Sequence, residues 1–284
     1  MAIQNGMSAT LGTVTLGAVD ASGVDWRLMT LEGWDSPDVR AEYSDREGDH
    51  GAWASPVYLG SRPITLGGII AAPSQALLEQ AMDRLRAAAG LDDTILTVWE
   101  SVPKQATVRR SGKPLMQYVT DTTASYSVMV TAADPRRYDT TLQSGSTHLP
   151  STTGGLTPPV TPPVTISAST VSGEIIAYNA GTFETAPVLV IDGPVNAPQI
   201  FAQLPGGGVA LFSYSQNLDT GEQLVIDADA HTVILNGNVS RRRFLNVSTG
   251  WPKIPAEAVV SFQFRSLSYN ANALLTVRWR SAWM

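Results

Sequence analysis

The chain has 284 residues, a formal net charge of −6 and no cysteine. At roughly 100 to 200 residues per domain the length predicts two domains. The absence of cysteine excludes disulfides, thiolate zinc sites and cysteine nucleophiles. Residues 1–140 contain 12 Lys and Arg against 17 Asp and Glu, and residues 141–284 contain 7 against 8. Neither half has the cationic surplus that binding to nucleic-acid phosphates requires.

Membrane and export signals are not visible in the sequence. No segment approaches the roughly 18 uninterrupted apolar residues that a membrane helix needs. The first ten residues, MAIQNGMSAT, show neither the basic region nor the apolar region of a secretory signal. We therefore expect a soluble, folded protein that is made in a cytoplasm and does not insert into a membrane.

The N-terminal half begins with short strand patterns. Apolar and polar residues alternate over Thr13–Leu16 and Trp26–Leu31 on either side of a turn cluster, which predicts a hairpin. Ser44–Gly51 is highly charged and predicts a long exposed loop. Extended-chain signals return over Val57–Ile70, where Pro63 predicts an edge strand or a bulge.

A single helix is predicted over residues 74–89. Ser74 can cap it, Gly90 follows it, and an apolar stripe runs along one side, comprising Leu77, Leu78, Ala81, Met82 and Leu85. This stripe predicts a face packed on a sheet. Further strands are predicted at 94–100, 107–110 and 125–132, which gives an α+β first domain.

The stretch from Gln143 to Thr165 cannot build a core. Ser, Thr and Gly fill most of it, and the pairs Pro158-Pro159 and Pro162-Pro163 favour extended geometry. We expect a semi-rigid linker here, with a ligand for a PxxP-reading domain as the alternative. The expected organisation is a first domain over residues 1–142, a linker over 143–165 and a second domain over 166–284.

The second half shows only strand patterns. Turn clusters such as Gly206–Gly208 and Asn236-Gly237 separate short apolar runs, and this spacing predicts an antiparallel β-sandwich. The predicted runs are Thr165–Ala168, Phe183–Ile191, Gln199–Leu204, Val209–Tyr214, Gln223–Ile226, Thr232–Leu235, Ala258–Arg265 and Leu274–Trp279. The fold class is therefore mainly β.

Two acidic clusters resemble metal sites. Asp45, Glu47, Asp49 and His50 could offer oxygen ligands to a hard cation, but the EF-hand spacing fails, because position 12 of the loop is Pro56. The second cluster, Asp227, Asp229 and His231, lies between two predicted strands, where Asp is a common turn former. We interpret both as solvated polar segments and expect no metal or cofactor.

Other motifs also fail as catalytic sites. Gly206–Gly208 leads into a strand rather than a helix, so it is a turn and not a phosphate cradle. His148 lies in the predicted linker and lacks the support that catalysis demands. Arg241–Arg243 is a basic cluster that we interpret as a solvated strand end, or as a partner for an acidic neighbouring subunit. We therefore expect no enzyme.

Several stretches in this order are similar to a known family. They are the loop Asp45–Ala54, the strand region Tyr58–Ile70, the single helix at 74–89, the segment Ala133–Asp139, and in the second half Ala186–Pro198, Leu224–Gly237 and Val277–Trp283. Together they make the chain resemble the distal tail proteins, or Dit, of long-tailed, non-contractile bacteriophages.

The resemblance implies a tail-tube-like β-sandwich or barrel as first domain and a galectin-like β-sandwich as second. It implies a homo-hexameric hub ring at the tip of the virion tail that joins the tail tube to the adsorption apparatus and leaves a channel for DNA. The implied neighbours are the tail tube protein, the tail-associated lysin or tail fibre hub, and the tape measure protein. An acidic first domain would suit a DNA conduit, because it repels phosphates.

Two other functions remain as hypotheses. The β-sandwich could be a carbohydrate-binding module that attaches to host cell-wall polysaccharide, which would add a host glycan as partner. Its aromatic candidates are Phe183, Phe201, Phe212, Tyr214, Trp251 and Tyr269. A cell-wall hydrolase has no supported acid, base or nucleophile in the sequence.

Overall fold

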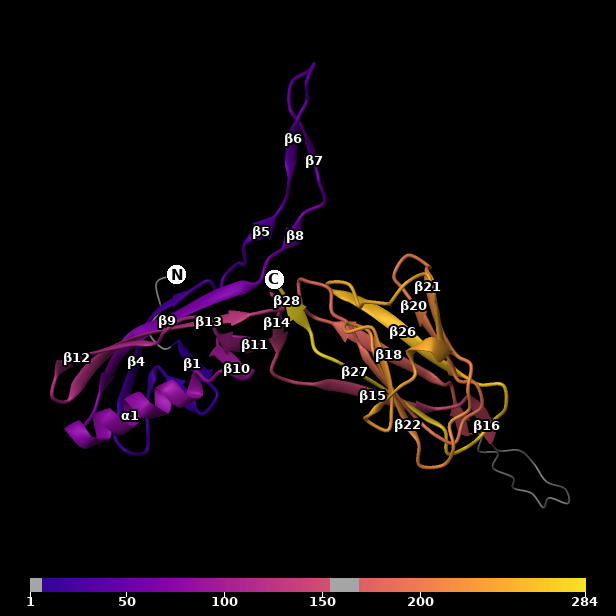
Figure 1. The fold of residues 1–284 in the computed structure, drawn as a ribbon. Coiled ribbons are helices and arrows are strands. Elements are labelled where there is room, and N and C mark those ends of the chain that lie inside the picture. The colour runs from indigo at the N-terminus through magenta and orange to yellow at the C-terminus, as the bar shows by residue number, and fades with distance from the viewer. Residues whose placement is uncertain (1–6, 154–168) are drawn as a thin grey trace, which may run out of the picture. The chain divides into compact units, whose positions relative to one another are not determined.

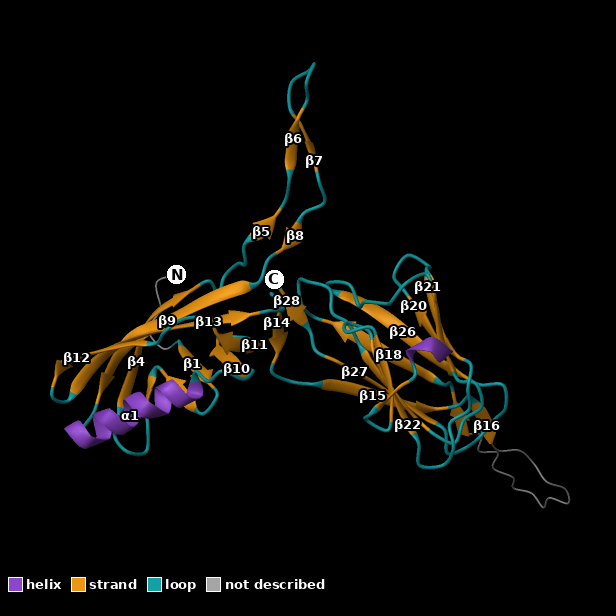
Figure 2. Ribbon diagram, viewed as in Figure 1, coloured by secondary structure: helices purple, strands orange, loops and turns teal. Residues whose placement is uncertain are grey.

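The computed structural model describes residues 7–153 and 169–284. Strands dominate it, and α1 (Gln75–Ala88) is the one α-helix in these two ranges (Figure 2). The chain divides into two compact units, residues 1–140 with Met284 and residues 141–283. No helix within the described ranges is long and apolar enough to cross a membrane. The predicted mainly-β fold with one helix is confirmed.

Most of the first unit is one antiparallel sheet with the order β2-β1-β10-β11-β13-β9-β4-β3. β2 and β3, at the two ends of this path, are consecutive in the chain. Its strands are β1 (Ser8–Leu11), β2 (Val14–Leu16), β3 (Ala18–Val19), β4 (Asp25–Glu32), β9 (Arg62–Ala71), β10 (Thr94–Trp99), β11 (Lys104–Arg110) and β13 (Thr123–Ala132). β12 (Leu115–Thr120) pairs only with β13, and the short β14 (Arg137–Asp139) pairs with the start of β11.

The helix forms where the sequence predicts it. Ser74 is its N-cap and accepts a hydrogen bond from the backbone N–H of Leu77. The stripe of Leu78, Ala81, Met82 and Leu85 is buried in the core of the first unit, together with the inward residues of the strands. Burial of this amphipathic face, rather than helix propensity alone, holds the helix in place.

Two predictions for the first unit are wrong. Thr13–Leu16 does not form a hairpin with Trp26–Leu31, because β2 pairs with β1 and the hairpin partner of β4 is β3. β9 is not an edge strand, since β13 and β4 flank it. Pro63 is tolerated there because the β4 pairing ends at Thr65, so at Pro63 only β13 is paired.

The second unit is an antiparallel β-sandwich, as predicted. One sheet has the order β15-β27-β19-β22-β23-β24 and the other β18-β26-β20-β21-β25. Their inward residues form a separate core that includes Phe212, Phe262, Phe264 and Trp279. The strands are β15 (Gln143–His148), β18 (Glu174–Asn179), β19 (Val188–Asp192), β20 (Gln199–Gln203), β21 (Val209–Tyr214), β22 (Gln223–Asp227), β23 (Thr232–Leu235), β24 (Val239–Ser240), β25 (Leu245–Ser248), β26 (Ala258–Arg265), β27 (Leu274–Trp279) and β28 (Ala282–Trp283).

The predicted linker needs a correction. Gln143–His148 forms β15 and pairs with β27, and β16 (Ser151–Thr153) pairs with β17 (Ser169–Val171). A stretch rich in Ser, Thr and Gly can form a strand when a neighbour supplies backbone partners. Gly145 also fits where a Cβ would lie 2.6 Å from Cγ2 of Ile175.

Residues 154–165 of the predicted linker, with both proline pairs, lie outside the described residues, as does the strand predicted at 165–168. The segment from 154 to 168 starts and ends at paired strands of the same unit. It therefore does not connect the two units, which meet in the sequence at Thr140 and Thr141.

Candidate functional site

A long two-stranded arm, residues 35–61, projects from the first unit (Figure 1). Its inner part pairs β5 (Val39–Arg40) with β8 (Tyr58–Leu59), and its outer part pairs β6 (Tyr43–Asp45) with β7 (Ala52–Ala54). The exposed loop predicted at Ser44–Gly51 is the tip of this arm and is exposed throughout. Sequence reasoning therefore found the exposed tip and the extended chain that contains β8, but it predicted a loop where β6 ends and no strand at β7.

The arm exposes large apolar side chains. Tyr43 and Trp53 are 69% and 67% exposed, and Val39, Val57 and Tyr58 are exposed to a similar degree. None of the arm residues belongs to the core cluster described for the first unit. Arg46 places its guanidinium 4.5 Å from the centre of the Trp53 ring, which covers the indole only in part. An isolated two-stranded ribbon is marginally stable in water, and exposed apolar patches mark candidate interaction surfaces, so the arm is the candidate site of the first unit.

The arm also concentrates the acidity of its unit. It contains Asp35, Asp38, Glu42, Asp45, Glu47 and Asp49 against Arg40 and Arg46, a net charge of −4. Residues 1–140 together carry −5, so the remainder of this half is close to neutral. The acidity that the sequence analysis assigned to a DNA conduit lies mostly on the arm.

The root of the arm, where Gly33–Trp34 and Arg62–Pro63 join it to the sheet, is fixed by backbone geometry. Gly33, just before the arm, has a φ of +79°, and a Cβ there would lie 1.9 Å from the carbonyl oxygen of Pro63. Only glycine fits this position, both for its conformation and for its space. The two legs of the arm therefore leave the sheet as closely packed neighbours.

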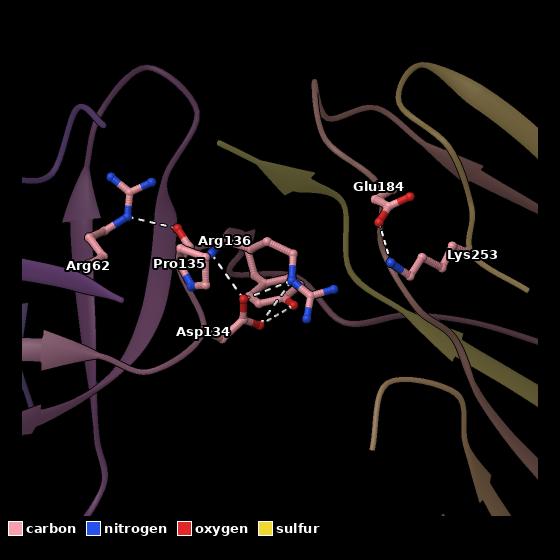
Figure 3. A network of polar contacts seen from close by, with 7 residues as sticks. Arg62, Asp134, Pro135, Arg136, Glu184 and Lys253 are labelled. Carbon is pink, nitrogen blue, oxygen red and sulfur yellow. Dashed lines mark hydrogen bonds and ion pairs between the residues drawn. The ribbon is translucent and has the colours of Figure 1, made fainter. Parts of the chain in front are cut away.

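Arg62 holds the root from inside. Its side chain is completely buried, its Nε donates to the carbonyl of Pro135 at 2.8 Å, and its Nη1 donates to the carbonyls of Gly33 and Trp34 at 3.1 and 2.7 Å. Figure 3 shows the bond to Pro135. One guanidinium thus joins both legs of the arm to the turn before β14. Sequence reasoning missed Arg62, because its partners are backbone atoms far away in the chain.

Arg62 remains charged despite its burial. Burial, followed by repulsion from Arg137, lowers the pKa of Arg62 to about 10, while Asp35 and Asp134 favour the charged form. A buried cation is tolerated where hydrogen bonds and opposite charges compensate for lost water. Its Nη2 has no hydrogen-bond partner within the described ranges.

Trp34, next to Gly33 at the root, is held by a second set of polar contacts. It is 1% exposed, and its indole Nε1 donates to Oε1 of Glu100 at 2.6 Å, while Nζ of Lys104 lies 2.6 Å from Oε2 of the same carboxylate. Burial opposes ionisation of Glu100, but the hydrogen bonds from Lys104 and Trp34 outweigh it and lower the pKa of Glu100 below its usual value. Glu100 therefore stays ionised and pins the indole.

The segment Ala133–Asp139, one of the stretches that carry the resemblance, contributes the turn that Arg62 reaches. Asp134 accepts a hydrogen bond from Nε of Arg136 at 2.8 Å (Figure 3). It also accepts one from the hydroxyl of Tyr138 at 2.6 Å. These bonds hold the turn that presents the carbonyl of Pro135. In the second unit, Figure 3 also shows an exposed ion pair between Lys253 and Glu184, which contributes little to stability.

The acidic clusters do not gather into metal sites. No group of three or more His, Asp or Glu that could hold a metal ion is present in residues 7–153 and 169–284. Asp45, Glu47, Asp49 and His50 are exposed at the arm tip, where Arg46 lies 3.8 Å from Asp49. Asp227 caps a turn instead, since its Oδ1 accepts from the backbone of Asp229 and Ala230.

The other motifs have structural roles. Gly206–Gly208 is the turn between β20 and β21, with φ near +90° at its first two glycines. Nδ1 of His148, on β15, lies 3.0 Å from the carbonyl oxygen of Ala273. Arg241–Arg243 directly follows the end of β24, as predicted, and Arg242 and Arg243 lie in a short 3-10 helix, η1 (Arg242–Phe244). Arg241 and Arg243 lie over the ring of Phe244.

Several of the aromatic residues proposed for sugar stacking are buried or already in contact with other side chains. Phe212 and Tyr214 are buried in the core. Trp251 is half-buried, with His231 stacked 4.7 Å away and the guanidinium of Arg242 at 5.0 Å from its ring. Tyr269 is exposed but lies in a loop. Phe183 and Phe201 are half-buried.

Comparison with known proteins gives matches in structure. No family model matches the chain, and no curated protein matches its sequence. The crystal structure of the SPP1 Dit (gp 19.1) protein, described as a paradigm of the hub adsorption apparatus in phages that infect Gram-positive bacteria, matches with a TM-score of 0.65. The match covers 98% of this chain and 99% of that chain at 10% identity. The chain has the fold of SPP1 Dit.

A second match supports the Dit fold. A chain of the phage P2 baseplate in its activated conformation with calcium has a TM-score of 0.52, covering 96% of this chain and 97% of that one at 9% identity. The resemblance to Dit proteins that the sequence indicates is thereby confirmed at the level of the fold.

Proposed function

We propose that this protein is a structural component of a bacteriophage tail tip, where it forms a hexameric hub ring between the tail tube and the adsorption apparatus. The single observation that carries the proposal is the Dit fold, which extends over both units and nearly the full length of each chain. The first unit forms the ring and leaves a channel for DNA, and the second is an outward β-sandwich. The proposed neighbours are the tail tube protein, the tail-associated lysin or tail fibre hub, and the tape measure protein.

The exposed arm supports a role in assembly rather than in catalysis. An extended ribbon with exposed aromatic residues gains stability only by burial against another molecule. Fold alone does not determine function, but this surface is independent of the fold comparison. The carbohydrate-binding alternative has less support, because Trp251 is already in contact with His231 and Arg242.

Antibody labelling of intact virions tests the proposed place of the protein. Gold particles directed against the second unit should gather at the tail tip, beyond the end of the tube. A matched antibody against the major tail tube protein should label the whole tail. Label along the full tail, on the head, or absent from virions would contradict the proposal.

A further inference from the structure

The first unit has a second surface without a partner, the outer edge of β12. This strand pairs with β13 on one side only, and Leu115, Tyr118 and Val119 are 60%, 51% and 62% exposed. The two end strands of the main path, β2 and β3, are only three and two residues long, so β12 is the longest strand with a free edge in the described part of the first unit's large sheet. A free strand edge with exposed apolar residues is a template for pairing with another chain.

The arm is acidic, whereas two cationic side chains lie just before β12, which has no charged residue of its own. The arm has a net charge of −4. Arg110 and Lys113 lie at the turn that leads into β12, and neither forms an ion pair within the described ranges. Arg109 in the same region is already paired with Asp93. The two unpartnered surfaces therefore match in polarity as well as in apolar character.

The two surfaces lie at opposite ends of the same sheet. The arm begins at the Arg62 end of β9, whereas β12 pairs with the part of β13 that lies opposite Gly67–Ala71 of β9. Figure 1 shows the arm projecting away from β12. At about 3.3 Å per residue, each leg of the arm reaches on the order of 40 Å beyond the sheet. A second copy of the chain, rather than the same copy, is the partner that this placement favours.

We propose that the arm of one subunit lies along the edge of β12 in a second copy of this chain. Tyr43 and Trp53 would then pack against Leu115 and Val119, and the acidic groups of the arm would face Arg110 and Lys113. Such a contact joins different surfaces of two identical subunits, so it is heterologous and can close into a ring. The inference rests on the proposed ring and assigns the residues that close it.

Cysteine cross-linking tests the contact, because the chain has no cysteine of its own. Two full-length variants with different tags, Ala54→Cys on the arm and Gln117→Cys on β12, are mixed during assembly and exposed to a mild oxidant. Both positions are exposed. The expected product is a disulfide-linked dimer that carries both tags. The control pairs Ala54→Cys with Gln80→Cys on the exposed side of α1, and it should give at least tenfold less dimer.

A charge exchange provides the second test. Arg110→Glu with Lys113→Glu on one side, or Glu42→Lys with Glu47→Lys on the other, should each raise the concentration needed for assembly about five- to tenfold, and combining all four changes should restore it. The expected change is modest because exposed ion pairs contribute little individually.

The outcomes separate this inference from the proposed function. The contact would be overturned, and the ring left standing, by a hexamer in which Ala54→Cys and Gln117→Cys do not cross-link. The same conclusion would follow if the variant with all four charge changes assembled no more readily than the variants with two. A wild-type chain that stays monomeric at every concentration would overturn both.

Discussion

At the scale of single residues, Arg62 decides how the arm is held. Its guanidinium is buried and donates to three carbonyls, those of Pro135, Gly33 and Trp34. These carbonyls belong to segments that no local sequence pattern brings together. A bidentate, planar donor is required here, because the ammonium group of Lys cannot reproduce the fork.

Replacement of Arg62 by Met should lower the free energy of unfolding by about 3 kcal/mol or more, since it leaves buried acceptors without donors. Urea unfolding of the full chain measures this change. The matched control is Arg86→Met on the exposed side of α1, where Arg86 pairs only with the exposed Asp83 and the cost should stay within about 0.5 kcal/mol. Equal effects of the two changes would contradict a structural role for Arg62.

Glu100 gives a prediction for pH. Its folded pKa lies below its ordinary value of 4.5, so its ionisation stabilises the fold fully above that pH, and this contribution is lost as the pH falls through the folded pKa. Glu100→Gln should therefore lower the melting temperature at pH 7, and the difference from wild type should shrink between about pH 4.5 and pH 3. Thermal unfolding across this range measures it, and a difference independent of pH would rule out the ionised carboxylate as the cause.

At the scale of elements, the sequence predicts those helices and strands that are marked by a periodic apolar pattern or by a capping residue. Ser74 and the stripe that contains Leu78 and Leu85 sufficed for the helix. β12 was missed because almost all its residues are exposed, so no alternation marks it. β15 was missed because its residues are small and polar, and it becomes a strand only through its pairing with β27. The tip of the arm was predicted from its charge, but the hydrogen bonds that Arg62 forms at its root were not.

Gly145 tests whether β15 is a strand in solution. Gly145→Val should lower the stability of the second unit by about 1 to 3 kcal/mol, because the new side chain meets Ile175. Ser144→Val, at an exposed neighbouring position, should be neutral or mildly stabilising, since valine favours strands. Thermal unfolding compares the two, and hydrogen exchange at residues 143–148 adds a local measure. Equal tolerance of both changes would mean that the segment is a linker after all.

Removal of the arm separates folding from assembly. Replacing residues 38–60 by a short Gly-Ser turn leaves the core of the first unit intact, because the arm contributes no residue to it. We expect circular dichroism and the melting temperature to stay close to wild type, whereas the assembled form is lost. Assembly that persists without the arm would show that other surfaces close the ring.

At the scale of the whole molecule, each unit has its own core. The first unit is a large antiparallel sheet with two exposed apolar surfaces, the arm and β12, and the second is a β-sandwich. Net charge is a poor guide to a conduit here, because the arm carries −4 of the −5 found in residues 1–140. The charge of a channel depends on which face of each strand lines it.

The organisation of the units was predicted only in part. Composition placed a boundary within a few residues of Thr140, but it extended the linker over strands, because a polar, glycine-containing stretch looks the same alone as when it is paired. Partners distant in the sequence supply that pairing.

Electron microscopy of the purified full-length protein tests the central claim most directly. The account predicts closed rings with six-fold symmetry and a central opening, with a mass of roughly 180 kDa for six copies of a 30.2 kDa chain. Single, unassembled particles at all concentrations, or open filaments without closure, would contradict it.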